Sequence, residues 1–76
     1  MIKFEKDEIY TAVLNEQYVY AKCIDIFYIE ESPYAMFEVE NNPELIYWGK
    51  IKRCSLMGGG MQETIINDEL SVYSGE

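Results

Sequence analysis

The chain has 76 residues, of which 14 are Asp or Glu, 6 are Lys or Arg and none is His, so its formal net charge is −8. This length allows one domain, and 49% hydrophobic residues exclude a disordered acidic tail, because such tails lack the apolar surface that offsets chain entropy. No apolar run approaches the roughly 18 residues of a membrane span, and the acidity argues against direct DNA or RNA binding, which needs clustered Lys and Arg. We therefore expect residues 1–76 to form one small cytoplasmic domain that binds neither nucleic acid nor membrane.

The first part of the chain predicts β-strands. Residues 1–8 alternate apolar and charged side chains, as in a short strand or an entry segment. Residues 9–14 are rich in β-branched and aromatic side chains and end at a turn. Residues 18–29 form the strongest element, with apolar side chains on both faces; a helix is the alternative, but Val, Tyr, Ile and Phe favour a strand. Such a strand is long, so we expect a bend or β-bulge that lets its halves serve different sheets.

The second part is divided by Pro and Gly. Pro33 ends the long strand, residues 34–40 alternate as a half-buried strand, and residues 41–44 form a turn. Residues 45–56 resume as a strand, with Gly49 where a bulge or a close backbone contact is tolerated. Residues 57–62 are a Gly-rich connection. Residues 63–73 form a last strand, or a short helical turn followed by a strand.

Together these elements predict an all-β fold with, at most, one short helical turn. We expect about five antiparallel strands in a small SH3-like or Tudor-like barrel, or in a strongly bent sheet. Residues 17–56 resemble SH3-like barrels of the Tudor kind: an aromatic-x-x-Ala-x-x-x-x-Ile strand, a tight acidic turn, an alternating strand and another turn. The aromatic cage of the methyl-lysine readers has no clear counterpart here.

The residue inventory disfavours catalysis and metal binding. Without histidine, the usual general base and the Ser-His and Cys-His pairs are absent. Cys23 and Cys54 lie in predicted strands, where we interpret them as small buried hydrophobes in a reducing compartment; one disulfide is the alternative. A zinc site needs about four N or S ligands, so we expect no metal and no cofactor. An enzyme would need an active site of carboxylates and tyrosines shared between chains.

Two short motifs have simple explanations. The glycines at 58–60 are followed by Met61-Gln62-Glu63, which lacks the Lys-Ser/Thr of a phosphate-binding loop, so a flexible hinge is the better interpretation. Lys50, Lys52 and Arg53 would form a small anion-binding spot, or would simply offset neighbouring carboxylates. We favour the second explanation.

Charge and tyrosine content point to a binding surface. Most acids fall in predicted turns or alternate outward, which speeds encounter with basic partners; solubility is the alternative reason for them. Tyr18, Tyr20 and Tyr28 share one predicted strand face, and tyrosine is enriched at interfaces, although a small barrel also leaves phenols half-buried. The predicted partner-binding residues are Tyr18, Tyr20, Tyr34, Tyr47, Glu30, Glu31, Glu38, Glu40 and Glu44.

The functional hypothesis is a small acidic, non-enzymatic protein that docks on a basic protein surface. Its sharper form is a nucleic-acid mimic of the phage or mobile-element type, whose carboxylates take the place of phosphates on a nucleic-acid-binding protein. The alternative is a homo-oligomeric β-barrel that covers its aromatic residues by self-association and binds a small ligand between subunits.

Overall fold

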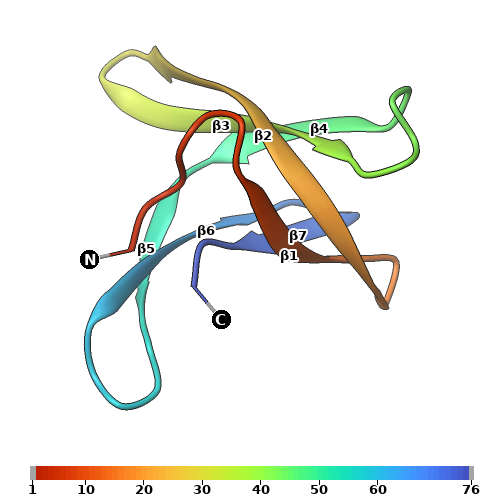
Figure 1. Ribbon diagram of the computed structural model, residues 1–76. Helices are drawn as coiled ribbons and strands as arrows, with labels where there is room; N and C mark the ends of the chain where they lie inside the picture. Colours follow the sequence, from red (N-terminus) through yellow and green to blue (C-terminus); the bar gives the residue numbers. More distant parts are fainter. Residues whose placement is uncertain (1, 76) are drawn as a thin grey trace.

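A computed structural model describes residues 2–75, which fold as strands joined by short turns (Figure 1). Among these residues there is no helix, and hence none long and apolar enough to cross a membrane. The all-β prediction is confirmed. The seven strands are β1 (Ile9–Leu14), β2 (Gln17–Ile29), β3 (Ser32–Val39), β4 (Ile46–Lys50), β5 (Lys52–Ser55), β6 (Met61–Ile66) and β7 (Leu70–Tyr73).

The strands form one antiparallel sheet in the order β4-β3-β2-β1-β7-β6-β5. The two outermost strands, β4 and β5, are consecutive in the chain with only Ile51 between them, so the sheet curls back on itself into a nearly closed barrel. Gly49 lies where β4 approaches β6: a Cβ atom at this position would sit 2.7 Å from Cγ2 of Ile65. The predicted close contact at this glycine is confirmed.

β2 is the strand around which the barrel bends. Its first part pairs with β1 and its second part with β3, and the β2–β3 register shifts between Cys23 and Asp25. The predicted β-bulge is therefore confirmed. The expectation of two separate sheets is wrong, because the bulge and the twist carry β2 around a single curved sheet.

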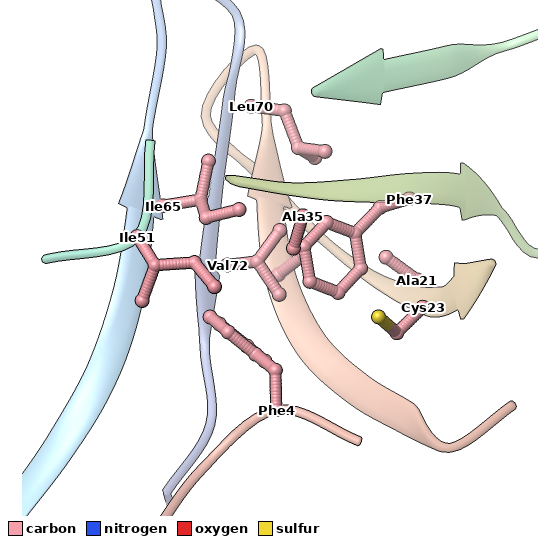
Figure 2. Close-up of a cluster of buried hydrophobic side chains, with 10 residues drawn as sticks. Phe4, Ala21, Cys23, Ala35, Phe37, Ile51, Ile65, Leu70 and Val72 are labelled. Atoms are coloured by element: carbon pink, nitrogen blue, oxygen red, sulfur yellow. The ribbon is translucent and has the colours of Figure 1, made fainter. Parts of the chain in front are cut away.

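The core fills the barrel and is closed at one end by the segment before β1. Phe4 is buried there, with its ring edge-on to Tyr10 and to Phe37, both at a centroid distance of 5.0 Å. Figure 2 shows the ring of Phe4 reaching into the cluster toward Ile51 and Val72, with Phe37 and Ala35 to one side and Ile65, Leu70, Ala21 and Cys23 farther along the core. Residues 2–8 thus form an entry segment, with one isolated bridge between Ile2 and Gln62.

The expected five strands of an SH3-like barrel are not matched exactly, because two predicted elements are each divided. The strand at 45–56 breaks at Ile51, which turns inward and donates its N–H to the Pro33 carbonyl at 2.9 Å. The final element is a β6–β7 hairpin. In its turn the Asn67 side chain accepts hydrogen bonds from the N–H groups of Glu69 (2.9 Å) and Leu70 (2.8 Å), in place of the helical turn considered from sequence.

The two cysteines are free thiols. Cys23 is fully buried in the barrel, as interpreted from sequence, and Cys54 is half-buried on β5. Burial raises the pKa of Cys23 to about 11, so its thiol is protonated at neutral pH. A protonated, enclosed thiol is a packing group and a poor nucleophile.

Candidate functional site

An aromatic cluster stands on the outer face of β2, β3 and β4. Phe27 and Tyr34 are cross-strand partners whose rings stack at a centroid distance of 5.8 Å and an interplanar angle of 13°. Trp48 lies 5.7 Å from Tyr34 and 6.0 Å from Phe27, tilted by about 50° to both. Although it packs on two rings, Trp48 still exposes 51% of its surface. We call Phe27, Tyr34 and Trp48 the aromatic cluster.

The strand registers explain why these rings meet. On β3 the buried Ala35, Phe37 and Val39 alternate with side chains that face outward, which places Tyr34 outside the barrel. The bulge in β2 changes which side chains face outward beyond Asp25, so that Phe27 stands beside Tyr34. In a regular strand without the bulge, Phe27 would lie on the face opposite Tyr18 and Tyr20. The sequence analysis assumed such a strand and therefore did not include Phe27 in the binding surface.

The aromatic cluster is the centre of a larger apolar surface. Ile46 of β4 and Ile29 of β2 are 48% and 42% exposed, and the half-buried Met36 pairs directly with Trp48. Trp48, Ile46 and Met36 were not among the predicted binding residues. The outward position of Trp48 could have been predicted from the alternation of residues 45–56. Gly49 and Ile51 face the inside of the barrel, so Trp48 faces outward.

Charged side chains border this surface. Asp25 pairs with Met36, and Glu38 lies between Lys22 of β2 and Ile46 of β4. Lys50 lies opposite Tyr34 at the border nearest β5. The surface is thus apolar at its centre and charged at its rim, which is the arrangement of protein-binding sites.

The β2–β3 turn places two more carboxylates next to the aromatic cluster. Glu30 and Glu31 have φ angles of 49° and 71°, the pattern of a type I′ turn. Such turns favour Asn-Gly, because a side chain with a Cβ atom is strained at positive φ. Both side chains are exposed at the tip of the hairpin.

A second feature is an acidic end of the barrel, on the right of Figure 1, formed by the β1–β2 turn, the β3–β4 loop and the β6–β7 turn. The Asn15 N–H donates to the Glu69 carbonyl at 3.2 Å, which joins the first turn to the third. The Tyr47 hydroxyl donates to Oε2 of Glu69 at 3.0 Å, which ties β4 to the same place. The carboxylates of this acidic end are Glu16, Glu40, Glu44, Asp68 and Glu69.

Five of the six basic residues lie away from the acidic end, whereas Lys22, in the middle of β2, lines a hollow with Glu40. Of the other five, two are in the segment before β1 and three are at positions 50, 52 and 53, where β4 passes into β5. The acidic end is therefore a local group of carboxylates with little basic charge beside it, whereas elsewhere in the described residues carboxylates and basic side chains are mixed. These basic residues are Lys3, Lys6, Lys22, Lys50, Lys52 and Arg53.

The predicted tyrosines do not form one stripe. Tyr18 and Tyr20 are 89% and 58% exposed on the outer face of β2, beside the turn that holds Glu16. Tyr47 is half-buried against the core, and its hydrogen bond to Glu69 raises the pKa of its phenol. Tyr28, which was expected on the face of Tyr18, lines a hollow at the opposite end with Phe4, because the bulge intervenes.

The predicted partner-binding residues consequently fall into two areas. Tyr18, Tyr20, Tyr47, Glu40 and Glu44 belong to the acidic end. Tyr34, Glu30 and Glu31 belong to the aromatic cluster and its rim, and Glu38 lies between the two areas. Asp68 and Glu69 at the acidic end were missed, because the Asn67–Leu70 turn was not recognised in the sequence. Glu16 lies in a turn that the sequence predicted, but only the order of the strands shows that this turn meets the β6–β7 turn.

These surfaces offer carboxylates, phenols and one indole to a binding partner. In the part of the chain that the structure describes, no three His, Cys, Asp or Glu side chains are grouped closely enough to hold a metal ion. The chemistry available on the outer surface is hydrogen bonding, burial of aromatic area and attraction of positive charge.

Comparison of the chain with protein-family models, with curated proteins and with solved structures found no significant match. Any functional conclusion therefore depends on the geometry and charge of the chain itself.

Proposed function

We propose that this chain is a small acidic, non-enzymatic binding protein that docks on a basic protein surface in the cytoplasm. The observation that carries the proposal is the grouping of carboxylates: turns distant in sequence bring Glu16, Glu40, Glu44, Asp68 and Glu69 to one end of the barrel, whereas the Lys and Arg residues other than Lys22 lie elsewhere. A concentrated field of one sign attracts and orients a partner of the opposite sign.

The exposed phenols of Tyr18 and Tyr20 support this proposal. They stand on the outer face of β2 next to the acidic end and expose most of their surface. Tyrosine supplies contact area and a hydrogen-bonding hydroxyl at a low entropic cost, and it is enriched at interfaces. A basic partner would meet carboxylates and phenols together.

A finer form of the proposal is mimicry of nucleic acid. The carboxylates of the acidic end would take the place of backbone phosphates on a nucleic-acid-binding protein and inhibit it, as a phage or mobile-element inhibitor does. The support is charge and size alone, which is an argument by analogy. Competition between this chain and DNA or RNA for the captured partner would test it.

Matched charge variants test the proposal. One variant carries Glu16→Gln, Glu44→Gln and Asp68→Asn at the acidic end, and its control carries Glu5→Gln, Asp7→Asn and Glu8→Gln in the segment before β1. All six side chains are exposed, and both variants lose the same charge. Each protein is immobilised and incubated with lysate of the source cells, and the retained proteins are quantified by mass spectrometry.

The proposal expects a basic protein that the wild type and the control retain and that the acidic-end variant loses. An equal loss of retention by both variants would show that net charge and not the acidic end is responsible, and full retention by both would show that these carboxylates do not bind the partner; either result would refute the proposal. Retention of no basic protein at all would refute the proposal.

A homo-oligomer is the second candidate, and the exposed Trp48 and Ile46 favour it. Self-association would cover these side chains and would create a junction for a small ligand. The charge of −8 on each copy opposes it, because two copies repel each other. Sedimentation at tens of micromolar decides the matter: a monomer at low and high salt would remove this candidate.

A further inference from the structure

We propose that the aromatic cluster is a binding site for an arginine side chain, carried by an extended basic segment of a partner protein. The inference depends on the proposed function in one respect, the basic character of the partner. It concerns a different face of the barrel from the acidic end. The two surfaces can therefore be tested separately.

The geometry of the rings leaves one aromatic surface for a ligand. Phe27 and Tyr34 stack on each other, so their facing sides are occupied. Trp48 leans at about 50° to both rings and keeps 51% of its surface exposed. An indole is the aromatic group that binds cations best, and a planar guanidinium stacks on it as well.

The rim supplies acceptors for the same ligand. In the register of the sheet, Met36 lies between Asp25 and Trp48 in one row across β2, β3 and β4, and Glu38 lies in the next row between Lys22 and Ile46. One oxygen of Asp25 already accepts the Ile26 N–H at 2.9 Å, which leaves its other oxygen and the Glu38 carboxylate as acceptors. A guanidinium has donors in a fixed plane, so it can stack on the indole and still donate to a carboxylate at its edge. Lys50 lies beside Tyr34, and its charge directs an incoming cation to the side of Asp25 and Glu38.

Charge selects a basic segment over a second copy of this chain. The chain carries −8, so two copies that meet at this face would bring like charges together. On β2, β3, β4 and the β2–β3 turn, the carboxylates of Asp25, Glu30, Glu31 and Glu38 outnumber the basic side chains of Lys22 and Lys50, and Arg53 lies beyond them in the hollow with Tyr28 and Pro33. The occupant is therefore expected to bring positive charge.

The test uses Trp48 as its own reporter, since it is the only tryptophan of the chain. The probe is an acetylated, amidated nine-residue peptide in which Arg alternates with Ser; matched peptides carry citrulline or Lys instead of Arg. Dissociation constants are measured from Trp48 fluorescence and from NMR shifts. They are compared with those of protein carrying mono-, di- and tetrafluorotryptophan, which weakens the attraction of the ring for cations while nearly keeping its shape.

We expect the Arg peptide to bind more tightly than the Lys peptide and the citrulline peptide least. Affinity should fall with each added fluorine, and Trp48→Leu should lower it by about fivefold. Trp48→Phe keeps an aromatic packing group if Trp48→Leu fails to fold, and it should give an intermediate loss. Met57→Ala, which removes a fully exposed apolar side chain in the β5–β6 connection, is the control, and it should leave the Arg peptide affinity within about twofold.

Two results would overturn the inference. In the first, the affinity for the Arg peptide does not change with fluorination or with Trp48→Leu, but binding is lost in the acidic-end variant. The peptide would then bind at the acidic end, and the proposed function would not be refuted. The other is concentration-dependent dimerisation abolished by Trp48→Leu, which would assign the face to a second copy. If the acidic-end variant retained the basic protein as well as the wild type in the capture experiment, the proposed function would be refuted, but the peptide result would still stand.

Discussion

At the scale of single residues, Gly49 sets how closely the barrel can close. It lies on β4 directly against Ile65 of β6, and there is no space for a methyl group between them. The contact brings β4, at one edge of the sheet, against β6 near the other edge, and Ile51, which follows β4, is buried.

We predict that Gly49→Ala lowers the free energy of unfolding by about 1–3 kcal/mol, because the added Cβ atom would lie 2.7 Å from Cγ2 of Ile65 and must displace it. Urea denaturation measures the change. Lys50→Ala on the exposed face of the same strand is the control and should stay within about 0.5 kcal/mol. If Gly49→Ala were as stable as the wild type, β4 would not pack as closely against Ile65 of β6 as this structure shows.

At the scale of elements, the β2–β3 hairpin retains two glutamates where its turn favours Asn-Gly. Their φ angles of 49° and 71° are the left-handed backbone that costs a residue with a side chain roughly 1–2 kcal/mol. The strained turn presents both carboxylates beside the aromatic cluster. This supports, as a hypothesis, a role for their charge in binding.

Glu31→Gly should therefore raise the free energy of unfolding by about 0.5–1 kcal/mol, since relief of backbone strain exceeds the extra chain entropy of glycine. Glu44→Gly removes the same charge at an exposed position that lacks a positive φ, so it should stabilise nothing. Denaturant melts of both variants make the comparison. Equal stabilisation by both substitutions would show that charge repulsion, and not the turn, is the cause.

The elements also show how far sequence reasoning reaches in this chain. Alternation identified the β3 core residues, and the length of β2 predicted its bulge. The alternation of side chains does not show at which residue a bulge occurs. The sequence analysis therefore placed Tyr28 on the same face as Tyr18 and did not identify Phe27 as an outward-facing residue. Tyr47 was expected at the binding surface, but it lies on the inner face of β4, as its spacing from Gly49 and Ile51 implies.

At the scale of the whole molecule, the main result is the distribution of charge around the barrel. The sequence predicted an acidic surface, but it could not show which turns would meet, because this depends on the order of strands in the sheet. The closed topology brings the turns near residues 15, 42 and 68 to one end. The aromatic cluster occupies a separate face, so the barrel presents two different binding surfaces.

The most direct test of this account is the salt dependence of binding to the captured basic protein. The dissociation constant is measured by calorimetry between about 50 and about 500 mM NaCl, a range over which the Debye length falls well below the size of the molecule. We predict that the affinity of the wild type and of the Glu5, Asp7 and Glu8 control falls roughly tenfold or more, and that the slope is clearly smaller for the Glu16, Glu44 and Asp68 variant. An affinity that stays constant across this range would contradict the account.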